Sequence, residues 1–391
     1  MGVEFDKNRF VGRDKALNSP ESDWNQIEQD LAPLRERIDA IDREILDLIN
    51  ERARAAQKIG HLKSGHQCDY YIPSREKAIF ERLSELNQGP LADDAVQSVY
   101  REIISACRSL ETKLTVAYLG PEGSYHHAAA TAHFGRSSEF VPTNTISQVF
   151  EEVERGRAEY GLVAIENSIE GSVNETLDKL VNSNVSIVGE RYLPISHNLI
   201  SFAELHEIEK VYSHPQALAQ CRNWLENNLA NVPLVQAPST TKGVQLCKDE
   251  PKAAAIAGVL ASDIFEVPIL VRGIEDHPDN TTRFYILGRK PLAPSGDDKV
   301  SMAVFIRDRP GALYSILEPF NRLEINLTNL ASRPSRLEIW QYMFFLECRG
   351  HHQEERIQKV IHEIEKNSIY IKVFGSYPRA QESQRVESSI G

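Results

Sequence analysis

Apolar residues recur every three or four positions through the first block of the chain. The pattern runs from about Trp24 to Gly65 and predicts one helix of ~40 residues, ~60 Å long at 1.5 Å per residue. Two shorter helices are predicted over 75–86 and around the apolar positions of 96–110. Because so long a helix cannot bury its apolar stripe alone, we expect it to pack against a partner helix or a second chain. Residues 1–23 carry no such pattern and are predicted to form a disordered tail.

The pattern changes after the helical block, 24–112. Over 113–290, short apolar runs that end in Gly, Pro or polar turns alternate with helical stretches, which is typical of an α/β domain with helices on both faces of its sheets. A linker rich in Pro, Gly and Asp follows over 291–299. Residues 300–377 have the order β-α-β-β-α-β of the α+β, ferredoxin-like fold, and 378–391 are predicted to be a loose tail. The sequence therefore predicts a multidomain protein.

Composition narrows the class of protein. The net charge of −12 argues against nucleic acid as the main partner, since phosphate neutralisation needs a basic surface. The five cysteines are scattered and form no Cys-x-x-Cys pair, which favours a reducing compartment without disulfides or a zinc site. We find neither a signal peptide nor a run of ~18 apolar residues, so we expect a cytoplasmic protein. The pairs His126-His127 and His351-His352 suit no particular metal, and we expect them to be exposed and no metal or cofactor to be needed.

One charged residue interrupts the apolar stripe of the long helix. Arg52 occupies a position of the stripe that is otherwise filled by Leu31, Ile38, Ile45 and Ile59. A charge on such a stripe needs a partner, because its desolvation is costly. Lys63 lies ~16 Å further along nearly the same face, so the two cations could converge on one small anion. From these residues alone, Arg52 could equally extend to solvent or pair with a neighbouring Glu.

The segments LRERIDAIDREILDLINERARAAQKIGHLK, YYIPSREKAIFERL and REIISACRSLE resemble the all-helical chorismate mutase family over about 30–111. The resemblance implies rearrangement of chorismate to prephenate by an active-site set of Arg35, Arg52, Lys63, Arg75, Glu76 and Glu111. Some relatives have a polar contact at the position of Ile72, Ser at that of Cys107 and Gln at that of Glu111. The first two are counted with the substrate-binding residues, and Ile72 would make its contact through the backbone.

The chemistry suits those residue types. The reaction is unimolecular, so the enzyme must hold a dicarboxylate in a compact shape and stabilise the negative charge that grows on its ether oxygen. Arginines can bind the carboxylates bidentately, Lys63 and Glu111 would flank the ether oxygen, and Glu76 would accept a hydrogen bond from the ring hydroxyl. Arg35 and Lys63 are 28 residues apart, ~42 Å along one helix. They can meet one ligand only if Arg35 reaches into the site of a second subunit, which predicts an intertwined homodimer.

Polar turns follow several predicted strands of the central block and begin helices. They lie at 120–124, 166–168, 213–216 and 239–241. Helix N-termini expose N–H groups that favour anions, although each of these turns alone is most simply an ordinary N-cap. Together they indicate a two-lobed cleft for a carboxylate ligand.

The motifs GPEGSY, VAIENSIEGSV, SHPQALAQC, AAIAG and DNTTRFYILG, in this order over 114–289, resemble prephenate dehydratases. The family's fold is two α/β subdomains, similar to periplasmic binding proteins. The resemblance makes Thr282 the essential catalytic residue and Arg283 a partner of a substrate carboxylate. It also implies that the cleft is lined by Ser124, Glu166, Asn167, Ser168, Ser213, Thr240 and Asn280. The reaction expels CO₂ and the ring hydroxyl, and a Thr hydroxyl is a weak acid. We therefore expect Thr282 to donate a hydrogen bond to the departing oxygen, with Glu166 as a candidate helper.

Residues 300–376 resemble the ACT domain, a small amino-acid-binding regulatory fold. Gly311, Ala312 and Leu313 match its Gly-Ala-Leu motif, and Ser332, Arg333 and Pro334 match its Glu-Ser-Arg-Pro motif, in which Ala331 replaces Glu. The resemblance implies that L-phenylalanine binds between paired ACT domains and inhibits the dehydratase. A domain that only dimerises is the alternative.

In this order the three blocks resemble bifunctional chorismate mutase/prephenate dehydratases, which convert chorismate to prephenate and phenylpyruvate in phenylalanine biosynthesis. Three alternatives stay open: a dehydratase whose helical block only dimerises, arogenate as a further substrate, and a two-lobed amino-acid sensor without catalysis. The Thr-Arg-Phe signature and the intact Arg/Lys/Glu set argue against the sensor.

Overall fold

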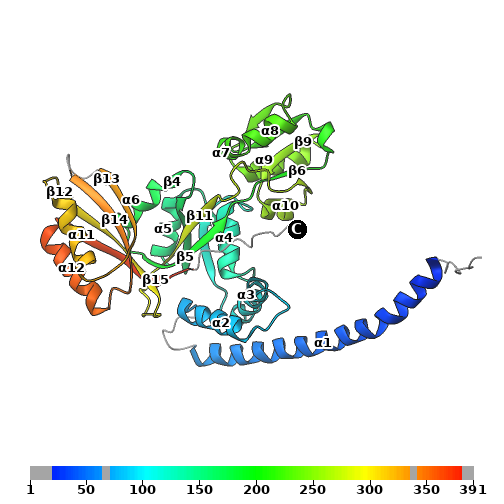
Figure 1. The fold of residues 1–391 in the computed structure, drawn as a ribbon, viewed down its shortest axis with the longest axis horizontal. Coiled ribbons are helices and arrows are strands. Elements are labelled where there is room, and N and C mark those ends of the chain that lie inside the picture. The colour runs from blue at the N-terminus through cyan, green and yellow to red at the C-terminus, as the bar shows by residue number, and fades with distance from the viewer. Residues whose placement is uncertain (1–19, 64–70, 335–340, 381–391) are drawn as a thin grey trace, which may run out of the picture. The chain divides into compact units, whose positions relative to one another are not determined.

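The computed structural model describes residues 20–63, 71–334 and 341–380 (Figure 1). The chain divides into two compact units, Met1–Ile59 and Gly60–Gly391. The predicted tail over 1–23 lies mostly outside the described residues, and helix begins at Pro20. In the described part, no helix is long and apolar enough to cross a membrane.

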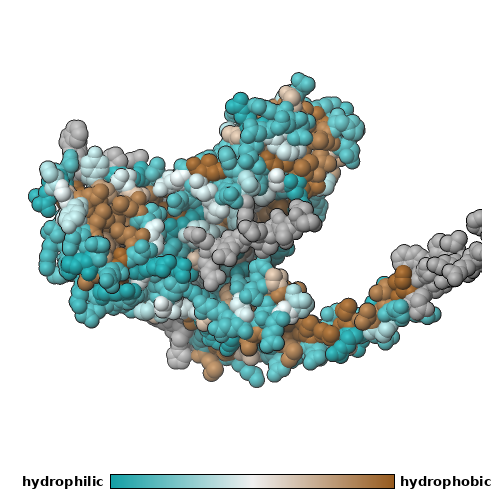
Figure 2. Space-filling view, viewed as in Figure 1, coloured by the Kyte–Doolittle hydropathy of each residue, from teal (hydrophilic) through white to brown (hydrophobic). Residues whose placement is uncertain are grey.

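Helix α1 (Pro20–Lys63) is continuous over 44 residues, as its periodicity predicts. Its apolar stripe is exposed in the single chain: Leu34 is 60% exposed, Ile38 57% and Leu48 57%. Figure 2 shows this stripe as a line of brown side chains along the helix. Apolar area in contact with water is unfavourable by roughly 25 cal/mol per Å², so the exposure agrees with the need for a partner.

Two further helices complete the helical block. Helix α2 (Pro73–Leu86) begins with a proline, whose missing N–H is not needed in the first turn. Helix α3 (Asp93–Ser109) buries Ile104, Ser105, Cys107 and Arg108 on one face. Both helices belong to the second compact unit, together with everything that follows.

The first lobe of the α/β block is built on a six-stranded mixed sheet of order β2-β1-β3-β11-β5, with β4 paired to β3. Strand β11 comes from the end of the block and runs antiparallel between β3 and β5. The strands are β1 (Thr115–Leu119), β2 (Glu139–Thr143), β3 (Tyr160–Asn167), β4 (Gly171–Ser172), β5 (Ser186–Pro194) and β11 (Thr281–Gly288). The helices of this lobe are α4 (Tyr125–Phe134), α5 (Ile146–Glu154) and α6 (Asn174–Asn182).

The second lobe is inserted between β5 and β11 and has a five-stranded sheet of order β10-β6-β9-β7-β8. Its strands are β6 (Asn198–Ser201), β7 (Lys210–Ser213), β8 (Leu234–Gln236), β9 (Ala253–Ala257) and β10 (Ile269–Val271). Its helices are η1 (Leu205–Glu207), α7 (Pro215–Gln220), α8 (Arg222–Asn228), α9 (Thr240–Asp249) and α10 (Val259–Phe265). The chain therefore passes between the lobes twice, and both passages lie next to β11 or β5.

The C-terminal block has the predicted β-α-β-β-α-β order, with strands in the order β13-β14-β12-β15. One face of the sheet packs on α11 and α12, and the other shares a core with α5 and α6 of the first lobe. The elements are β12 (Asp298–Arg307), α11 (Ala312–Arg322), β13 (Leu327–Pro334), β14 (Gln341–Arg349), α12 (Glu355–Asn367) and β15 (Tyr370–Pro378). The fold class predicted for all three blocks is confirmed.

Two local predictions were wrong. The histidine pairs are not solvent-exposed: His127 is 8% exposed and His351 0%, and the Nε2 atom of His126 is buried. Each pair packs into its domain, His127 on the ring of Tyr118 and His351 against the Leu292 carbonyl. Residues 379 and 380 of the predicted loose tail are held in place, because Arg379 pairs with Asp297 and the N–H of Ala380 donates to Glu190. Among the described residues, no group of three or more His, Cys, Asp or Glu side chains could hold a metal ion.

Candidate active sites

Thr282 and Asn167 lie opposite each other on the neighbouring strands β11 and β3. The Asn167 amide nitrogen Nδ2 lies 2.9 Å from Thr282 Oγ1 and 2.8 Å from Asn280 Oδ1. Asn167 Oδ1 accepts the backbone N–H groups of Ile169 and Glu170 at 3.0 and 3.1 Å. These two donors fix the orientation of the amide, so the group that faces Thr282 is the NH₂ and the threonine oxygen accepts.

The polarity of this contact determines what the Thr282 hydroxyl can do. A hydroxyl has one proton and two lone pairs. With one lone pair engaged by Asn167, the proton points in another direction and is available to a ligand. The strand pairing and the amide together preorganise a hydrogen-bond donor.

A chain of polar contacts continues from Thr282 into the second lobe. Asn280 Nδ2 donates to Gln220 Oε1 at 3.2 Å, and Gln220 Oε1 lies 2.8 Å from His197 Nε2. Burial lowers the pKa of His197, which favours the neutral ring. The Tyr125 hydroxyl lies 2.7 Å from His197 Nδ1 and donates to the Ser196 carbonyl at 2.9 Å. Side chains at the two passages between the lobes are thereby linked to strand β11.

Sequence reasoning missed three members of this chain. Tyr125 and Gln220 fall within motifs that were recognised, GPEGSY and SHPQALAQC, but nothing in the spacing separated them from their neighbours. His197 follows β5 and carried no signal. Gln220 Nε2 is buried and has no hydrogen-bond partner among the described residues, which leaves a donor beside Asn280.

The other residues predicted to line the cleft divide into two groups. Ser168 lies with Thr282 and Asn167, since its Oγ accepts the N–H of Thr281 at 3.0 Å and steadies the start of β11. Ser213 is fully buried and donates to the Ile256 carbonyl at 2.7 Å, so its hydroxyl is engaged inside the second lobe. Ser124 caps α4 and Thr240 begins α9, and the structure joins neither to Thr282 by a hydrogen bond.

Arg283 differs from its prediction. Successive residues of a strand point to opposite faces of the sheet, so Arg283 turns away from the side that Thr282 occupies. Its guanidinium, 6% exposed, lies 2.7 Å from Glu190 and 2.7 Å from Glu347. Glu166 faces the same way, with Oε2 3.9 Å from Arg283 Nη1. The structure therefore separates these two residues from Thr282 and Asn167.

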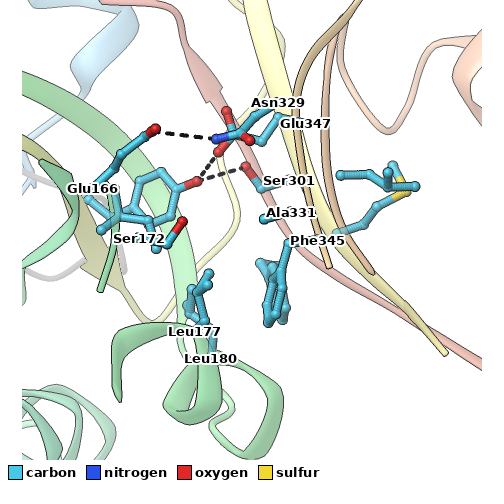
Figure 3. A pocket seen from close by; sticks show the side chains of 14 residues that line it. Glu166, Ser172, Leu177, Leu180, Ser301, Asn329, Ala331, Phe345 and Glu347 are labelled. Atoms are coloured by element: carbon cyan, nitrogen blue, oxygen red, sulfur yellow. Dashed lines mark hydrogen bonds between the residues drawn. The ribbon is translucent and has the colours of Figure 1, made fainter. Parts of the chain in front are cut away.

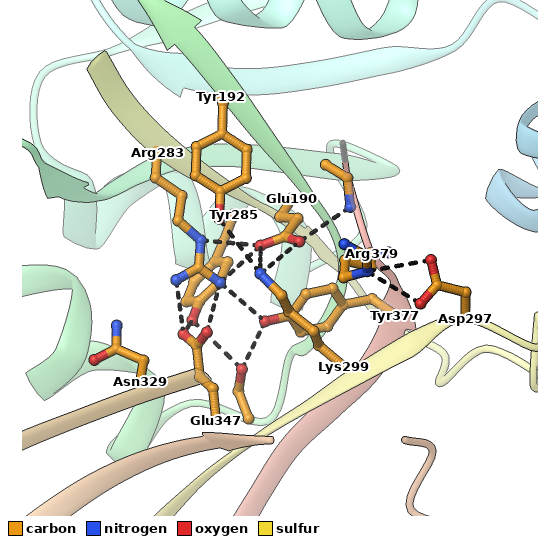
Figure 4. A network of polar contacts seen from close by, with 12 residues as sticks. Glu190, Tyr192, Arg283, Tyr285, Asp297, Lys299, Asn329, Glu347, Tyr377 and Arg379 are labelled. Carbon is orange, nitrogen blue, oxygen red and sulfur yellow. Dashed lines mark hydrogen bonds and ion pairs between the residues drawn. The ribbon is translucent and has the colours of Figure 1, made fainter. Parts of the chain in front are cut away.

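The Arg283 contacts form a buried ionic network between the dehydratase-like lobe and the C-terminal sheet (Figure 4). Lys299 Nζ lies 3.0 Å from Glu190, so two cations face two carboxylates. Burial lowers the pKa of Arg283, but Tyr285, Tyr377 and the two glutamates outweigh burial and raise it. Breaking a buried pair from one side costs about 3–5 kcal/mol, so this network holds the two domains in one arrangement.

Two cavities lie at the same junction. A small one of about 20 Å³ is bounded by Glu166, Tyr285, Ser301, Asn329 and Glu347 among others (Figure 3). A larger one of about 890 Å³ has a charged lining that includes Arg283, Lys299 and Arg349. Neither lining includes Thr282.

The predicted mutase residues fall in both compact units. In the first, Arg35 pairs with Glu28 on the exposed surface of α1 at 2.5 Å, and Arg52 is half-buried. In the second, Glu76 pairs with the buried Arg108 at 2.5 Å. Sequence reasoning did not single out Arg108.

Five more predicted mutase residues lie in the second unit. Glu111 packs on the end of α1, because a Cβ added at Gly60 would lie 2.9 Å from the Cβ of Glu111. Lys63 lies about one turn after Gly60 on the same helix. Cys107 is 3% exposed, and the Ile72 carbonyl accepts the N–H of Arg75 at 3.0 Å. The backbone oxygen of Ile72 thus belongs to the first turn of α2.

The predicted regulatory motifs lie at the start of α11 and on the edge strand β13. Gly311 has φ +77° and begins α11, a conformation that favours glycine, while Ala312 is buried and Leu313 is 37% exposed. Ser332 is exposed, and Arg333 donates to Asp178 at 2.6 Å and to the Asn174 carbonyl at 2.8 Å. The side chain of Pro334 lies outside the described residues.

Comparison with known proteins finds three families along the chain. Models of chorismate mutase type II, prephenate dehydratase and the ACT domain match residues 34–112, 116–292 and 300–366. A bifunctional chorismate mutase/prephenate dehydratase of Aquifex aeolicus is 45% identical over 90% of this chain and 99% of its own.

Solved structures resemble the last two domains. Prephenate dehydratase from Arthrobacter aurescens in complex with L-Phe is 31% identical over 68% of this chain and 90% of its own, with a TM-score of 0.63. The quorum-quenching acylase GqqA gives the same TM-score, 0.63, at 27% identity over 68% of this chain and 98% of its own.

Helices, a two-lobed α/β domain and a small regulatory sheet define a multidomain biosynthetic enzyme with two catalytic domains. The chain belongs to the family of bifunctional chorismate mutase/prephenate dehydratases. It converts chorismate to prephenate and prephenate to phenylpyruvate on the way to phenylalanine.

Proposed function

We propose that the Thr282 hydroxyl donates a hydrogen bond to the ring oxygen of prephenate as that oxygen leaves, and that Asn167 orients the Thr282 hydroxyl. The observation that carries this proposal is the 2.9 Å contact from Asn167 Nδ2 to Thr282 Oγ1. Asn280 and Ser168 hold the amide and the start of β11 in register. Gln220 completes the site as a buried donor.

The reaction does not require the Thr282 hydroxyl to be a strong acid. Loss of CO₂ from the ring releases electrons that expel the hydroxyl from the opposite carbon, and the ring becomes aromatic. The leaving oxygen gains negative charge, and a positioned donor there lowers the barrier by about 2.7–4 kcal/mol. The bond to the carboxylate carbon and the ring C–O bond break together, the oxygen leaves as hydroxide stabilised by the Thr282 hydrogen bond, and a proton from solvent converts that hydroxide to water.

Substitution of Thr282 by Val tests this role with little change in shape. Full-length Thr282→Val should lose phenylpyruvate formation from prephenate by ~10²-fold or more and keep its chorismate mutase rate. Thr281→Val is the matched control, because Thr281 is adjacent and on the other face of β11. If both variants formed phenylpyruvate at the same rate, the Thr282 hydroxyl would not be the donor.

For the mutase we propose a homodimer in which α1 of each subunit supplies residues to both sites. Arg52, Lys63, Arg75, Glu76 and Glu111 come from one subunit, with Cys107 and Ile72 beside them, and Arg35 comes from the partner. The exposed apolar stripe of α1 and the length of the helix support this arrangement.

For the C-terminal domain we propose that L-phenylalanine binds and inhibits the dehydratase, with Gly311–Leu313 and Ser332–Pro334 at its site. The phenylalanine complex of the Arthrobacter relative supports the choice of ligand. We also propose a cytoplasmic location, and domain boundaries of 24–112, 113–290 and 300–377.

A further inference from the structure

Helix α3 ends against the dehydratase lobe, although it belongs to the block that matches chorismate mutases. Ser105 Oγ accepts the N–H of Ser137 at 3.3 Å, and Glu102 accepts the N–H of Arg136 at 3.1 Å. A Cβ added at Gly135 would lie 2.3 Å from that of Ser105. The helix is therefore packed closely on the segment that follows α4.

Arg108 is the buried link at this contact. Its side chain is 6% exposed, and Nη1 lies 2.5 Å from Glu76 Oε1 on α2. Nη2 donates to the carbonyl of Phe134, the last residue of α4, at 2.6 Å. The guanidinium also lies over the ring of Tyr71, 5.1 Å from its centre. Because the planar guanidinium of Arg108 is bound at both nitrogens, it has one orientation, and it therefore fixes the position of the Glu76 carboxylate.

Arg108 is one of three arginines that act on His133. Burial, then Arg191, Arg101 and Arg108, lower the pKa of His133 well below its ordinary value. Glu76 is the carboxylate that pairs with Arg108 in this environment, and its field also opposes the fall in the pKa of Arg101 that burial causes. Neighbouring guanidinium charge favours the ionised, acceptor-only form of a carboxylate.

We infer that Arg108 is a positioning residue of the mutase reaction: it aims the Glu76 carboxylate at the ring hydroxyl of chorismate, and the C-terminus of dehydratase helix α4 holds Arg108 in place. This inference rests on the proposed role of Glu76. It makes the dehydratase lobe part of the support of the mutase site, so the two catalytic domains are not independent.

A double-mutant cycle on the full-length chain tests the inference. Arg108→Met and Glu76→Gln should each lower the mutase kcat by ~10–100-fold with a smaller change in KM, since a misaimed group costs that much. The double variant should be no slower than the slower single variant, because both remove one contact. The mutase kcat of Arg108→Lys should lie between those of Arg108→Met and the unchanged chain, because an ammonium keeps the positive charge but lacks the paired N–H donors of the guanidinium.

Two glycines of the dehydratase lobe supply a matched pair. Gly135 has φ +77° and touches α3, whereas Gly156 has φ +69° and faces the side chain of Arg289. Gly135→Ala should lower the mutase kcat, and Gly156→Ala should leave it unchanged. Equal mutase rates in the two variants would overturn the dependence on the dehydratase lobe.

Dehydratase turnover of prephenate by the same preparations reports whether each chain is folded. If Arg108→Met does not fold, Arg108→Lys decides, and an unchanged mutase kcat in it overturns the inference. A normal mutase rate in Glu76→Gln would instead remove the proposed role of Glu76. A slow Glu76→Gln whose effect adds fully to that of Arg108→Met would keep Glu76 and reject Arg108.

Discussion

One side-chain amide decides which way the Thr282 proton points. Asn167 is held by two backbone N–H groups, so it presents its NH₂ and not its oxygen to the threonine. A carboxylate of the same shape would reverse that polarity, because it can only accept.

Asn167→Asp should therefore turn the Thr282 hydroxyl toward residue 167. We expect the dehydratase kcat to fall by ~10²-fold or more, with the mutase rate of the same chain unchanged. Asn182→Asp, an exposed asparagine at the end of α6, controls for the added charge. Turnover of prephenate by Asn167→Asp at the rate of this control would contradict the proposed hydrogen-bond direction.

His126 makes stability depend on pH. Burial lowers its pKa from 6.5 to about 4, so the unfolded chain binds the proton first as the pH falls. The free energy of unfolding therefore falls by up to ~1.4 kcal/mol for each pH unit as the pH drops from about 6.5 to about 4. We expect His126→Phe, which keeps the contact with Phe284, to flatten the decline of the urea midpoint across that range. An equally steep decline in the variant would exclude His126 as a source.

The motifs predicted which residues lie close together better than they predicted the direction of each side chain. Asn167, Asn280 and Thr282 form the hydrogen-bonded group that their motifs predicted to line one site. Arg283 and Glu166 were grouped with them because they are adjacent in sequence, but strand alternation places them on the opposite face. His197 and Gln220 meet Asn280 only through the tertiary fold, so spacing along the chain could not show them.

At the scale of elements, helix α6 is held at both ends by basic side chains of the C-terminal sheet. Arg333 on β13 binds Asp178 and the Asn174 carbonyl near the start of α6. Lys372 on β15 donates to the carbonyls of Val181 and Ser183 at the end of α6, at 2.8 and 2.5 Å. Because α6 follows the turn that carries Asn167, a shift of the regulatory sheet would reach the catalytic strand through it.

Asp178→Asn should weaken this coupling. We expect the phenylalanine concentration for half-inhibition of the dehydratase to rise by ~5-fold or more, while the uninhibited rate stays unchanged. Glu175→Gln on the same helix is the control, because its contact is with Ser147 of the dehydratase lobe. Equal inhibition curves for the two variants would rule out α6 as the route.

The elements themselves were predictable for a plain reason. Strands such as YGLVAIEN and AAAIA are short apolar runs bounded by turns, and α1 keeps its helical period from end to end. The place of β11 between β3 and β5 was not predictable, since its partners are distant in sequence. Nor did periodicity show that residues 379 and 380 are held by Asp297 and Glu190.

At the scale of the whole molecule, the proposed mutase site needs residues from two chains. Arg35 and Lys63 lie 28 residues apart on the continuous helix α1, which corresponds to ~42 Å of helix at 1.5 Å per residue. In an intertwined dimer each site takes Arg35 from one chain and Lys63 from the other.

Mixing two inactive chains tests this directly. A hybrid of Arg35→Ala and Lys63→Ala subunits has one intact and one doubly damaged site, so an equal mixture should regain up to about a quarter of the mutase rate. Each variant alone should remain inactive. No recovery in verified hybrid dimers would contradict the shared site.

The central claim is that one chain carries two distinct active sites, with Thr282 essential to the second reaction alone. The most direct measurement supplies chorismate to full-length Thr282→Val and Arg52→Ala chains and follows prephenate and phenylpyruvate over time. The account predicts that Thr282→Val accumulates prephenate, and that Arg52→Ala leaves chorismate unused yet converts added prephenate. Phenylpyruvate formation from chorismate by Thr282→Val at the rate of the unchanged chain would contradict it.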